Sequence, residues 1–207
     1  MNIELYPIMS IADPLLLLAL RIYETSFPPH EQMTPSFWIK NLLTLAEGTV
    51  SLTAFIDQDN RDVVGMAFCE TIRPVSRPSV VFLWYLCIRA DQRGAGIGAQ
   101  AYQRLISRFF DEGICALVFE VERPDVAIEH GAGAADLAAR RIRWYQRNGA
   151  RLLRNVDYLQ HVDNGLPPTP MYLMVHSPHP LTPEEAFRML TEDVGLNAQA
   201  VGPLSLE

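Results

Sequence analysis

The distribution of apolar and polar positions divides the chain into strand-like and helix-like segments. Runs of β-branched and other apolar residues that end at turn residues predict strands. Apolar residues three and four positions apart, opened by capping residues and closed by glycine, predict helices. The predicted strands are 3–8, 49–56, 63–72, 80–88, 115–122, 151–161 and 171–175, and the predicted helices are 14–26, 35–46, 98–111, 135–147 and 183–193.

Several boundaries have a specific chemical basis. Asp13 followed by Pro14 is typical of the first positions of a helix, because proline needs no backbone hydrogen bond there. Thr182 with Glu185 is a capping box, which predicts the start of a C-terminal helix. The predicted connections are 27–31, 57–62, 73–78 and 163–168, and the tail beyond residue 195 is predicted to be irregular.

The length and composition favour one folded domain. The chain has 207 residues, of which 49% are hydrophobic, and this is enough to bury one core. No internal repeat or low-complexity linker interrupts it. Strands and helices in this mixed order predict a single α+β domain around a mixed sheet.

The charge of the chain limits its partners. The net charge is −7 and the isoelectric point is about 5.2, which argues against nucleic acid or an anionic membrane as a partner. An acidic protein suits a cationic amine substrate. The five histidines have neither metal-ligand spacing nor a nucleophile partner, so no metal site is predicted.

Two further features indicate a cytoplasmic protein. The apolar run 14–20 is far too short to cross a bilayer, and no basic segment precedes it, so neither a membrane span nor a signal peptide is expected. Cys69, Cys87 and Cys115 lie in strand-like apolar runs without paired ligand spacing. They are expected to be buried thiols in a reducing compartment.

A glycine-rich segment after the strand 80–88 is the most informative functional feature. Gly94, Gly96 and Gly98 lack a Cβ, so the chain can turn tightly and bring backbone N–H groups close to a phosphate. The following helix adds free amides and the positive end of its dipole. Arg93 adds a charge to which a diphosphate can bind. The predicted phosphate-binding residues are Arg93, Gly94, Ala95, Gly96, Ile97 and Gly98; the alternative is a glycine-rich helix start without a ligand.

One ligand class that uses such a loop is a dinucleotide. The sequence from Gly94 to Ala99 satisfies the pattern G-x-G-x-x-G/A, and Glu120 stands roughly where dinucleotide folds have an acidic residue. In those folds the first glycine follows its strand almost at once, whereas residues 89–93 intervene here. A nicotinamide-dependent dehydrogenase is therefore a distant alternative.

The order R-x-x-G-x-G, formed by Arg93, Gly96 and Gly98, fits a different family. The segment from Ile88 to Gly98 resembles the acyl-CoA pyrophosphate loop V-x-P-x-x-R-G-x-G-I-G of the GNAT N-acetyltransferase superfamily, with Ala90 in place of the proline. The predicted order of elements over residues 1–178 is also similar to that of this superfamily. The resemblance implies an α+β fold with a mixed, mostly antiparallel central sheet and flanking helices. Residues 1–178 would form the acyltransferase domain, and residues 179–207 a C-terminal helical extension that packs on the core or on a second subunit of a homodimer.

The resemblance also implies roles for particular residues. Trp144 to Ala150 is similar to the family's aromatic-Y-x-x-x-G-F segment, in which the tyrosine hydroxyl points at the CoA sulfur. Tyr145 would then be the general acid for the departing thiolate. Backbone N–H groups of the strand before the glycine loop would face the acyl carbonyl as it becomes an oxyanion. In this chain those groups belong to Leu86, Cys87 and Ile88.

Two carboxylates are candidates for the base. Glu120 and Glu122 share one face of the predicted strand 115–122, because strand side chains alternate between faces. Either could remove a proton from an incoming ammonium group, directly or through water. The alternative is a salt bridge to a helix arginine such as Arg140 or Arg143.

These observations predict an acetyl-CoA-dependent N-acetyltransferase. It would move the acetyl group to a small-molecule or peptide amine by direct transfer in a ternary complex, with acetyl-CoA as cosubstrate. The alternative is a non-catalytic acyl-CoA-binding or sensing module that lacks turnover. The retained Tyr145 favours the enzyme.

Overall fold

The structure is a computed structural model that describes residues 2–127, 129, 131, 133–161, 165 and 167–207. The strands are β1 (Ile3–Ile8), β2 (Val50–Asp57), β3 (Val63–Ile72), β4 (Val80–Ile88), β5 (Ala116–Glu122), β6 (Arg151–Gln160), β7 (Thr169–His176) and β8 (Ala198–Leu206). The helices are α1 (Leu16–Ser26), α2 (Pro35–Leu43), α3 (Ile97–Asp111), α4 (Pro124–Ala127), α5 (Ala134–Arg147) and α6 (Pro183–Arg188).

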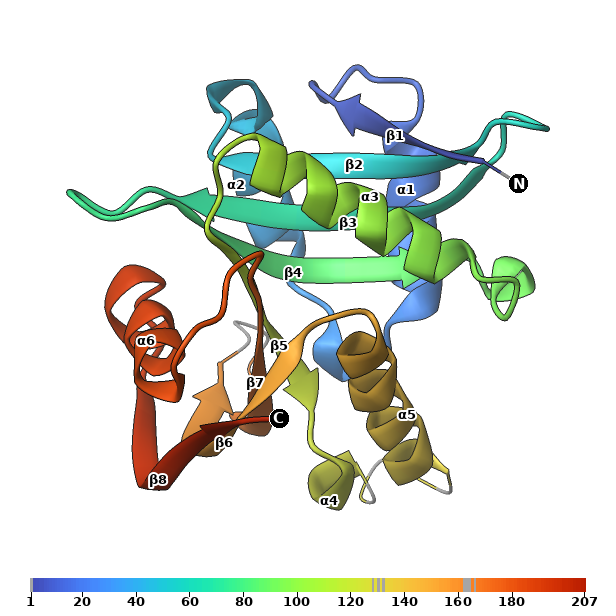
Figure 1. Cartoon of the computed structure of the whole chain (residues 1–207). Helices are drawn as coiled ribbons and strands as arrows, with labels where there is room; N and C mark the ends of the chain where they lie inside the picture. The colour runs from blue at the N-terminus through green and yellow to red at the C-terminus, as the bar shows by residue number, and fades with distance from the viewer. Residues whose placement is uncertain (1, 128, 130, 132, 162–164, 166) are drawn as a thin grey trace. The chain divides into compact units, whose positions relative to one another are not determined.

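The described strands form one mixed sheet in the order β1-β2-β3-β4-β5-β7-β6-β8 (Figure 1). β4 and β5 are parallel, paired over Val80–Phe82 and Ala116–Val118. The pairs β1–β2, β2–β3, β5–β7, β6–β7 and β6–β8 are antiparallel. The prediction of an α+β fold around a mostly antiparallel sheet is therefore confirmed.

The described chain divides into two compact units. The first comprises residues 2–71, 83–111 and 165, which include β1, β2, most of β3, the end of β4 and helices α1 to α3. The second comprises residues 72–82 and the described residues of 112–161 and 167–207, which include the start of β4, strands β5 to β8 and helices α4 to α6.

Helices cover both faces of the strands in the first unit. Leu52 and Ala54 of β2 belong to an apolar core with Trp38 of α2 and the buried face of α1. Thr53, between them, faces the other way and accepts a hydrogen bond of 3.5 Å from Arg108 of α3. This alternation places α3 on one face of the strands and α1 and α2 on the other (Figure 1).

The second unit has a helix packed against β5 and β6. Phe119 of β5 contacts Tyr145 of α5, with ring centroids 4.4 Å apart. Glu120 is the next residue of β5, so its side chain lies on the opposite face of the strand. β7 lies between β5 and β6, and Leu173 of β7 is paired with both Glu120 and Leu153 of β6.

Two predicted helix boundaries have different outcomes. The capping box is confirmed, because the Glu185 N–H donates to Thr182 Oγ1 (3.2 Å) and the Thr182 N–H to Glu185 Oε2 (2.8 Å). The predicted start at residue 14 is wrong, because α1 begins at Leu16. The Asp13 side chain accepts from Leu15 N–H at 2.9 Å, which holds the preceding residues in a turn instead.

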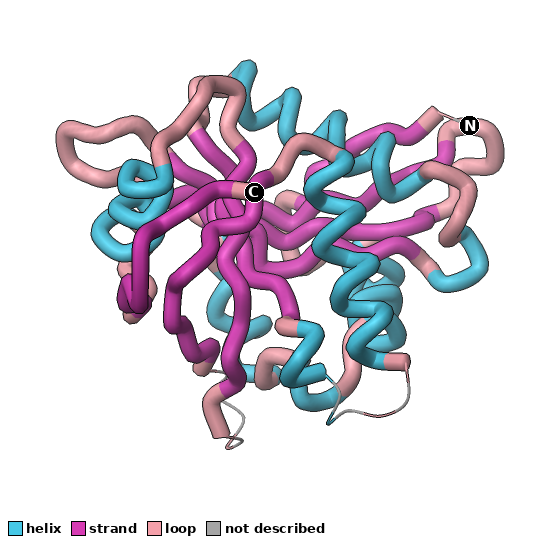
Figure 2. Tube along the Cα trace, turned by 60° about the horizontal axis from the view of Figure 1, so that its bottom comes forward, coloured by secondary structure: helices cyan, strands magenta, loops and turns pink. Residues whose placement is uncertain are grey.

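The irregular tail predicted beyond residue 195 is also wrong. Figure 2 shows a strand leading up to the C-terminus. This strand, β8, pairs with β6 in antiparallel register, for example Tyr158 with Ala198 and Leu153 with Leu206. Most of its side chains are exposed, and Gly202 and Pro203 interrupt it. The strand therefore lacks the apolar alternation by which a strand is predicted.

The region after β5 and the predicted turn 163–168 also differ from a simple strand end and a fully described turn. Pro124 ends β5 as predicted but also begins α4, a helix of four residues that the sequence did not predict. Positions 163, 164 and 166 of the predicted turn 163–168 lie outside the described residues. Within the part of the chain that the structure describes, no helix is long and apolar enough to span a membrane.

Candidate active site

The glycine-rich loop before α3 forms a cluster of backbone donors. Gly94 and Gly96 have positive φ angles of 88° and 80°, while Ala95 between them does not. Alternating signs of φ turn successive N–H groups toward one side, which makes an anion-binding concavity. No hydrogen-bond acceptor for the amides of residues 94–99 occurs among the described residues. A Cβ at either glycine would meet no atom within 4 Å, so a phosphate can approach this backbone.

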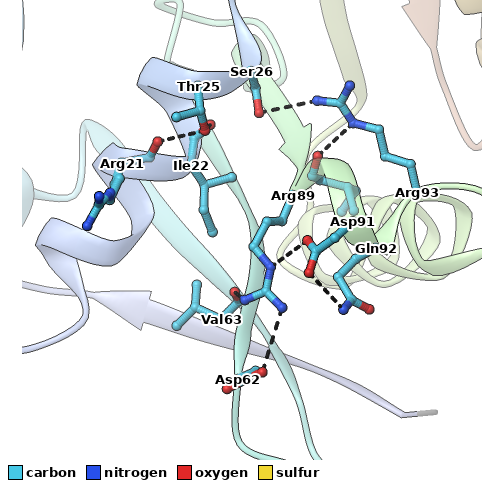
Figure 3. Close-up of polar contacts among 11 residues, drawn as sticks. Arg21, Ile22, Thr25, Ser26, Asp62, Val63, Arg89, Asp91, Gln92 and Arg93 are labelled. Carbon is cyan, nitrogen blue, oxygen red and sulfur yellow. Dashed lines mark hydrogen bonds and ion pairs between the residues drawn. The ribbon is translucent and has the colours of Figure 1, made fainter.

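Arg93 holds this loop in place. Its Nε donates to the carbonyl oxygen of Ile88 at 2.9 Å, and one terminal nitrogen donates to Ser26 Oγ at 3.4 Å (Figure 3). The side chain thus links the glycine loop to the end of β4 and to the end of α1. It is exposed, and its remaining N–H groups can meet a phosphate.

Arg89 fixes the segment ahead of the glycines. Its guanidinium donates to Asp91 at 2.7 Å and to the Val63 carbonyl at 3.2 Å, and it lies 3.7 Å from Asp62 (Figure 3). The hydrogen bond from Arg89 holds the pKa of Asp91 below its usual range. Sequence reasoning assigned no role to Arg89, which anchors the start of the loop to β3.

The three residues predicted to supply oxyanion donors lie at the end of β4. Cys87 and Ile88 are buried, and Leu86 is half-buried. Burial raises the pKa of the Cys87 thiol to about 12. This thiol therefore stays protonated near neutral pH and does not compete as a nucleophile.

Glu120 has an environment suited to proton transfer. Its Oε1 accepts a hydrogen bond of 2.5 Å from the Tyr158 hydroxyl, and its Oε2 accepts one from Gln160 Nε2. Burial disfavours the charged form more than these donors favour it, and the pKa of Glu120 rises to about 7. A carboxyl group with this pKa is about half ionised at neutral pH, so it can accept a proton and release it again.

Glu122 has a different interaction partner from Glu120. It is buried, and Arg141 of α5 lies 3.9 Å from its Oε2. The alternative of a salt bridge to a helix arginine therefore holds for Glu122, although the partner is Arg141 rather than Arg140 or Arg143. The two glutamates share a strand but differ in their partners.

Tyr145 lies in the last turn of α5, with 7% of its surface exposed. Its ring packs against Phe119, so the side chain contributes to the core as well as carrying a hydroxyl group. Gly149 follows the helix with a φ of 99°, and a Cβ there would lie 2.9 Å from the His176 ring. The glycine four residues after Tyr145 is therefore required by the backbone conformation and by the close approach of His176.

Sequence reasoning missed Tyr158 and Gln160. Both belong to the predicted strand 151–161 and are two positions apart, which places them on one face. Their partner could not be identified, because they reach Glu120 across the intervening strand β7. No cluster of three or more potential metal ligands occurs among the described residues.

Comparison with known proteins defines the class of protein. The acetyltransferase (GNAT) family profile matches residues 17–130, more than half of the chain. With its α+β fold and glycine loop, the protein is an acetyltransferase by class. The chain belongs to the GNAT acetyltransferase family. No curated protein sequence matches it.

Solved structures share the fold. A GNAT-family acetyltransferase from Bacteroides thetaiotaomicron is 22% identical, with a TM-score of 0.65 over 94% of this chain and 99% of that one. One from Elizabethkingia anophelis with acetyl-CoA bound is 14% identical, with a TM-score of 0.56 over 85% of this chain and 98% of that one. An Arabidopsis thaliana protein in complex with the bisubstrate analogue CoA-Ac-MVNAL is 16% identical, with a TM-score of 0.57 over 86% and 99%.

Proposed function

We propose that the protein transfers an acetyl group from acetyl-CoA to a primary amine, in a ternary complex and without an acyl-enzyme intermediate. Membership of the GNAT family supports acetyl transfer in general. The observation that carries the enzymatic proposal is the Glu120 carboxyl group, whose pKa of about 7 is matched to deprotonating an amine at neutral pH. A module that only binds acyl-CoA has no use for such a group.

The acyl donor is assigned to the glycine loop. The unsatisfied amides of residues 94–99 and the start of α3 bind the pyrophosphate, and Arg93 adds a positive charge. The backbone of Leu86, Cys87 and Ile88 donates to the carbonyl oxygen of the thioester. The neighbour solved with acetyl-CoA bound supports the choice of ligand.

The reaction needs one proton removed and one supplied. Glu120 takes a proton from the ammonium group, and the free amine forms a C–N bond with the thioester carbon. The C–S bond breaks as the tetrahedral intermediate collapses, and Tyr145 donates its proton to the thiolate. The product amide loses its extra proton to solvent, from which Tyr145 regains its own. Glu120 releases its proton to solvent and is ready for the next turnover. Glu122 is buried beside Arg141, and we assign it the role of supplying negative charge near the incoming ammonium group.

The two catalytic side chains lie on opposite faces of β5. Tyr145 contacts Phe119, and Glu120 points to the other side of the strand. In a tetrahedral intermediate the incoming nitrogen and the leaving sulfur are different substituents of one carbon, so they can be approached from different sides. The arrangement therefore separates the site of deprotonation from the site of thiolate protonation.

The direct test uses acetyl-CoA with a panel of primary amines and peptides. We expect release of free CoA thiol in proportion to acetylated amine with at least one member of the panel. The measurement combines thiol detection with mass spectrometry of the acceptor. Binding of acetyl-CoA without thiol release for every amine would favour the non-catalytic module, and binding of a nicotinamide dinucleotide instead would favour the dehydrogenase.

The donor site is tested by Gly96→Asp. The carboxylate repels the pyrophosphate, and a side chain is strained at a φ of 80°. We expect the affinity for acetyl-CoA, measured by calorimetry, to fall by about 100-fold.

Gly113→Asp is the matched control for Gly96→Asp. Gly113 has a φ of 84° and the same open surroundings, but it follows the other end of α3. Its variant should bind acetyl-CoA with parental affinity. Equal loss in both variants would mean that strain alone weakens binding, and unchanged affinity of the Gly96 variant would remove the glycine loop from the site.

We also propose an acceptor class, a cellular location and domain bounds for the enzyme. The acceptor is a small-molecule or peptide amine, and the protein acts in the cytoplasm without a metal. Residues 1–178 act as the acyltransferase domain, with residues 179–207 as its C-terminal extension. That extension includes β8, which pairs with the strand that carries Tyr158.

A further inference from the structure

A cavity lies in the second unit, and Glu120 is not among its lining residues. It has a volume of about 360 Å³ and is bounded by α4, α5, β6 and β7. Tyr172 of β7 lines it and is paired with Val121, the neighbour of Glu120 on β5. Because side chains alternate along a strand, the cavity opens on the face opposite to Glu120. None of the residues assigned to acetyl transfer lines this cavity.

This cavity, here called the α5 pocket, has a lining that is part apolar and part polar. Ile142 of α5 and Leu152 of β6 contribute aliphatic surface, and Tyr172 contributes an aromatic ring. Arg123 and Arg154 lie over this ring, with their guanidinium carbons 5.2 and 5.3 Å from its centroid. The volume is within the range of small-molecule sites, and the apolar part of the lining can contact an apolar group.

Of the charged groups that line the α5 pocket, Arg143 is the one without a carboxylate partner among the described residues. Asp125 is neutralised by Arg123, which donates to both of its carboxylate oxygens at 2.6 and 3.2 Å. Arg154 is paired with Glu207 at 2.8 Å. Arg143 lines the pocket, is exposed, and has no carboxylate partner within the described ranges. Asp157 also acts on Arg123, so the surrounding charges balance, and Arg143 is the group that remains able to pair with an anion.

From these features we infer that the α5 pocket binds a small organic carboxylate whose apolar body packs on Tyr172 and whose carboxylate pairs with Arg143. A guanidinium group binds a carboxylate through two parallel N–H···O bonds, which adds geometry to the charge attraction. Arg154 also lines the pocket, from β6, but it is already paired with Glu207. The site is independent of the proposed acetyl transfer.

The test uses benzoate as the probe and benzamidine as its control, at constant ionic strength. Both have one aromatic ring, but benzamidine has a positive charge. We expect benzoate to bind with millimolar affinity and to shift the NMR signals of Tyr172 and of the Ala139 methyl group, which also lines the pocket. Benzamidine should shift neither. Equal shifts with both probes, or none with benzoate, would overturn the inference.

Two variants locate the site. Arg143→Gln should weaken benzoate binding by about 10-fold or more, because a charge-assisted hydrogen-bonded pair is lost. Arg147→Gln is the matched control, since Arg147 lies one turn further along the exposed surface of α5 and does not line the pocket. It should bind benzoate normally. Equal weakening in both variants would indicate general charge attraction and no site.

A third variant fills the pocket without changing its charge. Ala139→Trp places a large side chain in the cavity from a half-buried position on α5, so folding should be retained. Benzoate binding should be lost, while the melting temperature stays near the parental value. Retained binding in a folded Ala139→Trp protein would place the carboxylate elsewhere.

Discussion

Replacing Glu120 with glutamine is expected to lower kcat for acetyl transfer by about 10²–10⁴-fold, the range typical for loss of a positioned base. Glutamine keeps the shape of the side chain and can still accept from the Tyr158 hydroxyl. It has no basic oxygen that can take the proton of the ammonium group. The measurement is steady-state turnover with a saturating amine found in the panel, and acetyl-CoA affinity should not change.

Glu122→Gln is the matched control. It changes the same functional group two residues along the same strand, but this residue is paired with Arg141 and not with the Tyr158 hydroxyl. We expect less than about a tenfold loss of kcat. The reverse order of effects would make Glu122 the base, and parental turnover in both variants would assign deprotonation to water.

The pH profile follows from the same carboxyl group. With a pKa of about 7, Glu120 is mostly protonated and inactive as a base at pH values well below 7, so kcat should rise with pH with a midpoint near 7. The Tyr158 hydroxyl favours the ionised form of Glu120, because it donates to that carboxylate. Tyr158→Phe should therefore shift the midpoint of the profile to higher pH. A purely structural role of Tyr158 would lower kcat without moving the midpoint.

Glu120→Gln should also change stability in a pH-dependent way. Between pH 4.5 and about 7 the unfolded chain loses the Glu120 proton while the folded protein retains it, so the raised pKa progressively destabilises the native state as pH rises. The cost is complete once the pH is well above 7, and it is on the order of 3 kcal/mol. The variant should melt at a higher temperature than the parent at pH 8 and at the same temperature at pH 4. A loss of folding stability in exchange for activity is common where a catalytic group must be held in an unfavourable environment.

The outline of the fold could be predicted because its main elements have strong local signals. The apolar runs of β2 to β5 and the glycines before α3 reflect burial and backbone conformation, which act over short stretches of sequence. β8 lacks such a signal, because it is an exposed edge strand with Gly202 and Pro203 inside it. Only its pairing with β6 defines it as a strand.

The candidate base could be proposed from the sequence, but not its environment. Tyr158 and Gln160 meet Glu120 because β7 and β6 are placed in the order β5-β7-β6, which differs from their order along the chain. Their register also depends on an irregularity at Asn155, which has a φ of 60° and breaks the pairing of β6 with β8. Non-sequential strand order and a local bulge are set by tertiary packing, so sequence periodicity does not reveal them.

Replacing Tyr145 with phenylalanine is expected to lower kcat by about 10²–10⁴-fold while leaving the fold and acetyl-CoA affinity intact. The ring packs 4.4 Å from Phe119 and is retained, so only the hydroxyl is lost. A phenol with a pKa of about 10 and a thiol with a pKa of about 8.5 are close enough that a hydrogen bond to the developing thiolate stabilises it before the proton has fully moved. The loss should therefore appear in kcat and not in amine binding, because the acid acts only as the C–S bond breaks.

The control for Tyr145→Phe is Tyr6→Phe, which removes a hydroxyl bonded to Asp13 at 3.2 Å in the first unit. It should turn over at close to the parental rate, with thermal melting of both variants showing that each is folded. If Tyr145→Phe also retains parental turnover, Tyr145 is a packing residue of α5 and the thiolate is protonated by water. Tyr145 and Glu120 lie on opposite faces of β5, so that outcome would leave the assignment of Glu120 as the base unchanged. It would, however, mean that the site has no protein acid on the other face of the strand.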